Sequence, residues 1–257
     1  MTATRLSLAA DLRAIGLGPD DAVLVHAALR QVGRVTGGPD TILAALQDVV
    51  GPGGTVLGYT DWQLEDEERD DPALRPHIPP FDPERSRATR ENGFWPELVR
   101  TTPGAYRSGS PGASMAAIGG RAEWFTADHA LDYGYGPQSP LGKLVEARGK
   151  VLMLGAPLDT MTLLHHAEHL ADFPNKQVIR YEAPLLVDGV ATWRWFEEFD
   201  TGNVPAGMAD DYFATIVEAF LATGQGQRRV IGEARSVLVN ATEIVPFAVG
   251  WMEENIR

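Results

Sequence analysis

Short apolar runs alternate with amphipathic helical patterns along most of the chain. The runs at 22–26, 55–59 and 151–154 are nearly continuous in apolar residues, as in strands that are buried on both faces. Segments with helical periodicity separate these runs. Helices are predicted at residues 4–16, 40–50, 92–99, 121–126, 139–148, 161–172, 209–222 and 242–256, and further strands at 114–118 and 229–239.

Residues 177–199 have the pattern of a β-hairpin. Two strand-like runs, 177–187 and 191–199, flank Asp188-Gly189, a dipeptide that favours tight hairpin turns. Together with the order of strands and helices, this predicts an α/β fold of the layered α/β/α type, with a central mostly parallel or mixed sheet and a C-terminal hairpin and helix addition. Nothing marks a domain boundary, so we expect residues 1–257 to form a single domain.

Residues 60–90 show little periodicity. An acidic run at 61–71 is followed by a proline-rich segment at 77–83. A stretch of this length without periodicity is either functional or disordered. Because it leaves directly from the end of a predicted strand, we predict a loop that faces the substrate.

The predicted helix at 161–172 divides into two faces at about 100° per residue. It follows the buried strand 151–154, and in open α/β sheets ligands bind beyond the carboxyl ends of strands. We therefore predict that this helix carries the reactive centre. The core-facing arc would hold Leu163, Leu164, Ala167, Leu170 and Ala171, and the polar arc Thr162, His165, Glu168, His169 and Asp172.

His165 and Glu168 are three residues apart on the polar arc, so their side chains can meet. A carboxylate beside an imidazole selects its tautomer and stabilises its protonated form, which suits a general base near neutral pH. A solvated pair on an ordinary amphipathic helix is the alternative.

The residues at 165–169 also match H-x-x-E-H, the zinc-peptidase pattern, with His165 and His169 as ligands and Glu168 as base. That interpretation needs a third ligand, for which the downstream candidates are Glu182, Glu197 and Glu198.

Composition narrows the classes of partner. Lys and Arg number 22 against 35 Asp and Glu, a net charge of −13 that argues against nucleic acid and suits either a cationic ligand or simple solubility. The absence of cysteine excludes disulfides, thiolate catalysis and cysteine-based zinc sites. No apolar run approaches the roughly 20 residues that span a bilayer, and residues 1–16 lack the apolar core of a signal peptide. A cytoplasmic protein with no membrane partner is expected.

Two loops and a set of acids are further candidates. Residues 26–38 form a glycine-containing connection before a helix, where backbone N–H groups can hold phosphate, and residues 107–114 offer hydroxyls and turn amides for phosphate or pantetheine. The alternative for both segments is an ordinary loop that binds no ligand. A ligand that carries several ammonium groups would need a set of carboxylates to bind them. Tryptophan side chains can provide flat apolar surfaces against which a sugar ring packs. The acids in predicted loops or at strand ends are Asp61, Asp159, Glu182, Glu197 and Asp200, and the tryptophans are Trp62, Trp193 and Trp195.

The chain resembles the acetyl-CoA-dependent aminoglycoside 3-N-acetyltransferases, which lie outside the GNAT superfamily. Four blocks carry the resemblance: 23–62, 79–83 with 106–119, 136–144 and 151–184. The last is the most specific, since it contains T-x-L-H-x-A-E, D-x-P-N-K and Y-E-x-P. The resemblance implies acetyl-CoA along the loop 26–36 and the segment 107–115, on His26, Ala27, Ala28, Leu29, Gly33, Arg34, Val35, Thr36, Arg107, Ser108, Ser110, Ser114 and Met115. It implies the antibiotic in an acidic pocket, for which we select Tyr59, Asp61, Trp62, Asp159, Glu182, Glu197 and Asp200.

The resemblance also implies the chemistry. His165 matches the helix histidine of the family and Glu168 its carboxylate partner. The expected reaction is acetyl transfer from acetyl-CoA, without a metal, to the 3-amino group of a 2-deoxystreptamine aminoglycoside, in a ternary complex that gives resistance. Thr162 or backbone N–H groups are candidate donors to the oxyanion. One departure is Ser110, which stands where many members have the histidine of R-S-x-H-P. A protein that holds CoA or antibiotic without turnover is a further alternative.

Overall fold

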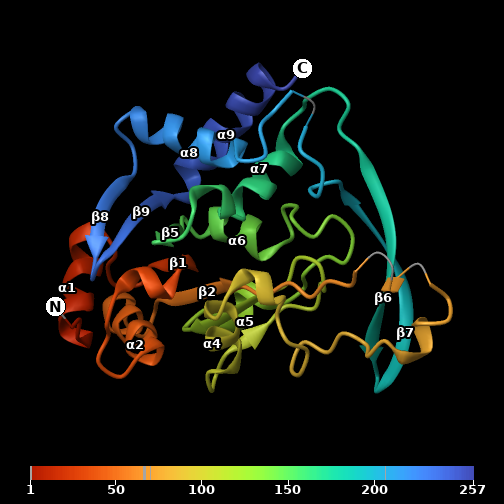
Figure 1. Ribbon diagram of the computed structural model, residues 1–257, viewed down its shortest axis with the longest axis horizontal. Helices are drawn as coiled ribbons and strands as arrows, with labels where there is room; N and C mark the ends of the chain where they lie inside the picture. Colours follow the sequence, from red (N-terminus) through yellow and green to blue (C-terminus); the bar gives the residue numbers. More distant parts are fainter. Residues whose placement is uncertain (1, 66–67, 70, 206) are drawn as a thin grey trace.

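The computed structural model describes residues 2–65, 68–69, 71–205 and 207–257. In this part of the chain, a seven-stranded sheet with the order β3-β4-β2-β1-β5-β9-β8 forms the centre of the molecule, and β6 and β7 form a separate two-stranded sheet (Figure 1). The strands are β1 Ala22–Ala27, β2 Thr55–Tyr59, β3 Tyr106–Arg107, β4 Met115–Gly119, β5 Lys150–Leu154, β6 Val178–Val187, β7 Val190–Phe199, β8 Gln227–Ile231 and β9 Ala234–Asn240.

The middle of the large sheet is parallel and its two sides are antiparallel. β1 pairs in parallel with β2, where Ala22 faces Thr55, and with β5, where His26 faces Met153. β4 and β9 then run antiparallel to β2 and β5. The sheet is therefore mixed, and the carboxyl ends of β1, β2 and β5 meet at one edge, where ligands bind in such folds.

Helices cover both faces of this sheet and complete three layers. One apolar core forms between the sheet and α1, α2 and α4, and the other between the sheet and the helices from α5 onward. The boundaries of α1 have a local cause, since it begins after the capping box of Thr4 and Ser7 and ends at the left-handed Gly16. The helices are α1 Arg5–Ile15, α2 Pro39–Val50, α4 Trp95–Thr101, α5 Ala122–Thr126, α6 Pro140–Glu146, α7 Leu163–Leu170, α8 Tyr212–Ala222 and α9 Ala241–Asn255, and the 3₁₀ turns are η1 Leu29–Val32, η2 Arg75–His77, η3 Arg90–Asn92 and η4 Leu158–Thr160.

The hairpin of β6 and β7 stands to one side of the large sheet (Figure 1). Asp188 and Gly189 both have positive φ, of 50° and 79°, as the predicted tight turn requires. The loop that follows β2 folds back against the hairpin, where the N–H of Phe81 donates to Pro184 O at 2.7 Å and Phe81 O accepts from the N–H of Leu186 at 2.9 Å. Phe81 is buried there with Ala183, Leu185 and Phe196. The predicted α/β class, the mixed sheet and the hairpin are all confirmed.

Two details of the prediction were wrong. Residues 229–239, predicted as one strand, form the end of β8, a turn at Gly232 and most of β9, because Gly232 adopts a positive φ of 61° and reverses the chain. Leu170, assigned to the core-facing arc, is 45% exposed, since α7 ends at this residue, beyond the core. On the same helix, His166 is buried, and its Nδ1 bonds Tyr135 O.

Among the described residues, no helix combines the length and apolar character needed to cross a membrane.

Candidate active site

The predicted imidazole–carboxylate pair forms on α7. His165 Nδ1 lies 2.6 Å from Glu168 Oε2, so one turn of helix brings the two groups into a hydrogen bond. The Glu168 carboxylate is buried, whereas the His165 side chain remains 25% exposed. With the hydrogen on Nδ1 donated to Glu168, His165 Nε2 is left as the nitrogen that can accept a proton.

Aromatic rings hold the His165 imidazole from two sides. The ring of Tyr135 lies 5.0 Å from it, and the ring of Phe213 meets it edge-on at 4.9 Å. His26, at the end of β1, is a third neighbour. Burial and then the charge of His165 lower the pKa of His26 to about 4, and its buried Nε2 has no hydrogen-bond partner. His26 is therefore neutral near pH 7 and can act there only as an uncharged group.

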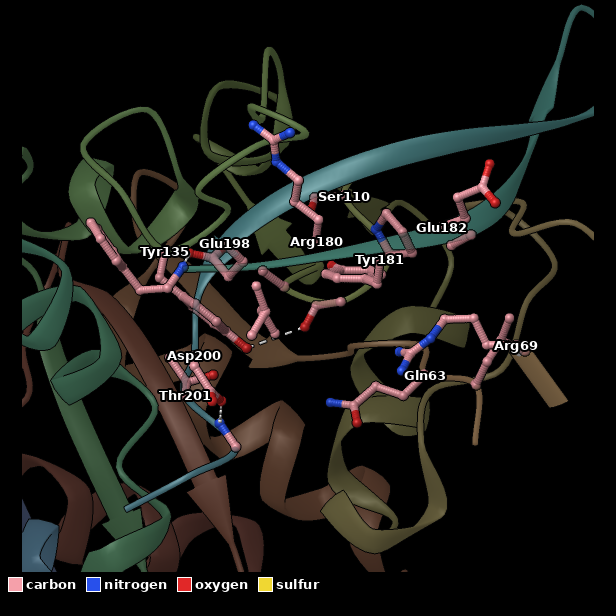
Figure 2. Close-up of a pocket in the computed structure, with 18 of the residues that line it drawn as sticks. Gln63, Arg69, Ser110, Tyr135, Arg180, Tyr181, Glu182, Glu198, Asp200 and Thr201 are labelled. Carbon is pink, nitrogen blue, oxygen red and sulfur yellow. Dashed lines mark hydrogen bonds between the residues drawn. The ribbon is translucent and has the colours of Figure 1, made fainter. Parts of the chain in front are cut away.

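A cavity of about 570 Å³ lies beside this pair, between the hairpin and the loops at the edge of the sheet. Tyr135 and Glu198 line the cavity and also act on His165, the first by ring contact and the second by charge. Figure 2 shows the side chains that surround it. A smaller cavity of about 230 Å³, lined by Glu168, shares Phe199, Asp200, Thr201 and Asn203 with the first. His165 itself lines neither cavity, but Tyr135 and Glu198, which act on its imidazole, belong to the wall of the larger one, whose volume suits a drug-sized ligand.

Several of the predicted acceptor-binding residues do surround this cavity. Trp62, Glu182 and Asp200 line it, although Glu182 is already paired with Arg75 at 2.7 Å. Asp61 is buried behind Trp62 and Gln63, where Asn92 and Gln63 donate to its two oxygens. Burial raises the pKa of Asp61 to about 6, against the effect of these hydrogen bonds.

Tyr59 reaches the same place from the end of β2. Its hydroxyl lies 2.7 Å from that of Tyr135 and 3.0 Å from Gly112 O. Tyr135 and Gly112 both line the cavity. Tyr59 therefore supports the wall from behind.

Two predicted acids lie elsewhere. Asp159 is exposed in η4 and does not line the cavity. Glu197 points to the other face of β7, where the Tyr133 hydroxyl and Arg180 donate to it. Its neighbour Glu198 lines the cavity instead, a residue that the sequence analysis named only as a possible zinc ligand.

Glu198 is the buried carboxylate of the cavity. Burial raises its pKa to about 7, although backbone N–H groups of Phe199, Gly134 and Tyr135 favour the charged form. The alternation of β7 is the signal for it, since Phe196 and Glu198 share the face that packs inward. A carboxyl group with its pKa near neutrality in a cavity is a strong functional candidate.

The geometry argues against the zinc-peptidase alternative. His169 lies in an aromatic pocket, 5.1 Å from the ring of Phe199 and 5.8 Å from that of Tyr133, and burial lowers its pKa to about 4. His165 already uses Nδ1 for Glu168. Across the described ranges, no three His, Cys, Asp or Glu side chains are grouped as metal ligands.

The segment 107–115 is largely committed to internal contacts. Ser108 is buried and its hydroxyl accepts from the N–H of Met115 and bonds His129, while Met115 lies in the core. Arg107 donates to Ser86 O, Thr60 O and Ser114 Oγ. Ser110 differs from them, because it lines the cavity.

We expect Arg107→Met to lower the free energy of unfolding by about 2–4 kcal/mol, since it leaves three acceptors without their charged donor. Chemical denaturation measures this loss. Arg85→Met, at an 84% exposed position, is the control and should change stability by less than about 0.5 kcal/mol. An unchanged Arg107→Met protein would show that Arg107 does not hold the loops together.

The segment 26–36 lies at the ligand-binding edge of the sheet. The N–H of Ala28 donates to Leu154 O, and Gly33 lies against Glu233 of the β8–β9 turn. Ala3 pairs with Val35, while Arg34 and Thr36 are exposed. The structure places this segment beside the carboxyl ends of β1 and β5, outside the lining of the large cavity. Its role in binding acetyl-CoA stays a prediction.

Comparison with known proteins agrees with this architecture. The family model described as aminoglycoside 3-N-acetyltransferase matches residues 24–253. Aminoglycoside N(3)-acetyltransferase III of Pseudomonas aeruginosa is 46% identical, over 97% of this chain and 93% of its own. The enzyme VII of Streptomyces paromomycinus is 44% identical, over 98% and 92%.

Solved structures match over the whole chain. AAC-IIIb in a binary complex with CoASH is 61% identical and superposes with a TM-score of 0.96, over 100% of this chain and 98% of that one. AAC-VIa bound to sisomicin is 34% identical, with a TM-score of 0.93 over 100% and 99%. Family model, relatives and structures agree with the resemblance found in the sequence: the chain belongs to the aminoglycoside 3-N-acetyltransferase family.

Proposed function

We propose that this protein transfers the acetyl group of acetyl-CoA to the 3-amino group of a 2-deoxystreptamine aminoglycoside. The observation that carries the proposal is the His165–Glu168 pair, which lies beside a cavity with carboxylates in its wall. A relative with the same fold is known in complex with CoASH, and another with sisomicin. Acetylation removes one cation that such a drug needs for binding anionic RNA, which gives resistance its physical basis.

His165 is the proposed general base. An ammonium group has no free electron pair, so the acceptor amine must lose a proton before or during its attack. His165 Nε2 takes that proton while Glu168 holds the ring and balances its charge. The neutral amine nitrogen then bonds to the acetyl carbon and the bond from that carbon to sulfur breaks. The second proton of the nitrogen passes to the departing thiolate, and the proton on His165 is released to solvent.

The acetyl donor is proposed to lie along residues 26–36, at the edge of the sheet. His26 fits this placement, since its unpartnered Nε2 lies near His165 at the end of β1. Acetyl-CoA supplies an activated thioester there. Thr162, at the start of α7, caps no backbone N–H, so we propose its hydroxyl as a donor to the carbonyl oxygen. The chain contains no cysteine, so a cysteinyl acyl-enzyme is excluded.

The acceptor is proposed to occupy the large cavity. Glu198 and Asp200 offer carboxylates to ammonium groups, while the rings of Trp62 and Tyr181 offer apolar walls to the sugars. Because acetyl-CoA is a cytoplasmic metabolite, we place the enzyme in the cytoplasm and assign it neither nucleic-acid nor membrane partners. We treat the chain as one domain, since the hairpin and the loops at the edge of the large sheet line one cavity.

A thiol-release assay tests the proposal. Kanamycin, gentamicin and tobramycin are each added with acetyl-CoA, and free coenzyme A is measured with a thiol reagent. Release that depends on both substrates is expected. Binding of antibiotic or CoA by calorimetry without release would instead identify a binding protein.

The KM for the aminoglycoside should depend on pH through Glu198. With its pKa raised to about 7, this carboxyl is charged above neutral pH and becomes protonated below it. We therefore expect KM to rise about fivefold from pH 8 to pH 6, as most of the Glu198 charge is lost. Initial rates at saturating acetyl-CoA measure it, and a flat profile would remove Glu198 from acceptor binding.

A further inference from the structure

Tyr212 contacts the catalytic pair from the side opposite the imidazole. It is the first residue of α8, and its buried hydroxyl donates to Glu168 Oε1. The other oxygen of the same carboxylate, Oε2, faces His165 Nδ1. Three side chains from two helices thus form one hydrogen-bonded row, from Tyr212 through Glu168 to His165.

We propose that Tyr212 is a positioning residue, whose hydroxyl fixes the Glu168 carboxylate so that His165 keeps Nε2 free for the acceptor amine. The inference rests on the proposed function, because it assumes that His165 is the base. Tyr212 touches neither reacting group and acts only through Glu168. Its ring is anchored independently of the hydroxyl, since it packs edge-on against Phe213 at 4.7 Å within the apolar core.

The start of α8 holds both members of the pair. Tyr212 bonds Glu168, and the next residue, Phe213, packs against the His165 ring. Burial and the charge of Glu168 raise the pKa of Tyr212 far above its ordinary value, so its hydroxyl keeps the proton that it donates. A carboxylate that is fixed at both oxygens cannot rotate away from the imidazole without losing a hydrogen bond.

Other charged and titratable groups act on this row. Lys176, from the segment after α7, interacts with Glu168 by charge. His26 of β1 and Glu198 of β7 interact with His165 in the same way. Their effects on the row remain when the Tyr212 hydroxyl is removed, so a change in the pH profile of a Tyr212 variant reports the lost hydrogen bond.

Tyr212→Phe tests the proposal, because it removes the hydroxyl and keeps the ring. We expect kcat to fall about 5–20-fold with both KM values within about twofold, since small misplacements of catalytic groups are costly. The pH profile of kcat should also change, because the Glu168 carboxylate loses one of the two hydrogen-bond donors that hold it beside the imidazole. Tyr133→Phe is the matched control: it also removes a phenol–carboxylate hydrogen bond, to Glu197 at 2.5 Å, away from the site.

A double-mutant cycle with Glu168→Ala separates action through Glu168 from any other role. If Tyr212 acts through Glu168, adding Tyr212→Phe to Glu168→Ala changes kcat by less than about twofold. Losses that multiply in the double variant, or a single variant with the kcat and pH profile of the wild type, would overturn the proposal. A wild-type protein that releases no coenzyme A would instead reject the proposed function. Thermal unfolding of each variant shows that the protein compared is folded.

Discussion

Replacement of His165 by glutamine is expected to lower kcat by about 10²–10⁴-fold, the usual contribution of a general base. Glutamine can still bond Glu168 but has no nitrogen that accepts a proton at neutral pH. The KM values for both substrates should stay within about threefold, because His165 Nε2 acts on a proton and the cavity walls bind the acceptor. Steady-state kinetics with each substrate varied in turn measure the two effects.

His169→Gln is the matched control for this prediction. His169 lies on the same helix, one turn further on, but its ring packs between Tyr133 and Phe199. We expect its kcat to stay within about threefold of the wild type, since the substitution touches no proposed reacting group. If kcat fell equally in both histidine variants, and a chelator abolished activity that zinc then restored, the zinc-peptidase hypothesis would be supported instead. Normal turnover of His165→Gln would exclude His165 as the base.

Replacement of Glu198 by glutamine is expected to lower kcat/KM for the aminoglycoside by about 10–100-fold, mainly through KM, because a buried charge pairs strongly with an ammonium group. The same variant should also lose the dependence of KM on pH between 6 and 8. A series of aminoglycosides that each lack one amino group would identify the ammonium group that Glu198 contacts. The measurement is kcat/KM for each derivative with the wild type and with Glu198→Gln.

Glu197→Gln is the control, because Glu197 lies next to Glu198 in sequence but on the other face of β7. It should leave kcat/KM within about twofold, since it only weakens bonds from Tyr133 and Arg180 on the face of β7 that points away from the cavity. A larger loss in Glu197→Gln than in Glu198→Gln would mean that the acceptor binds to the outer face of the hairpin. Glutamine has nearly the same volume as glutamate, so a change in side-chain volume cannot explain a lower kcat/KM in Glu198→Gln.

Local patterns predicted what local geometry determines. The spacing of His165 and Glu168 on one helix was enough to place their hydrogen bond, because three residues span nearly one turn. Asp188-Gly189 predicted the hairpin for the same reason. The choice between Glu197 and Glu198 required knowing which face of β7 packs inward, and that depends on contacts with Tyr181 and the loop around Phe81.

Residues that act across long distances in sequence were the hardest to interpret. Arg107 was predicted to bind acetyl-CoA, yet it bonds carbonyl groups 47 and 21 residues before it. Tyr212 lies 44 residues from Glu168 and was not selected at all. A tyrosine at the start of an apolar helix carries no sign of its partner, since the partner is decided only when α8 packs beside α7.

The separation of the hairpin from the central sheet has an evolutionary consequence. The proposed base and its partners stand on helices that pack on the large sheet, whereas much of the wall of the proposed drug-binding cavity belongs to β6, β7 and the loop folded against them. Substitutions on that arm can reshape which antibiotics are accepted while the proton-transfer machinery stays intact. Under changing drug pressure, resistance of this kind can broaden its spectrum by small steps, with no intermediate that has lost the capacity for turnover.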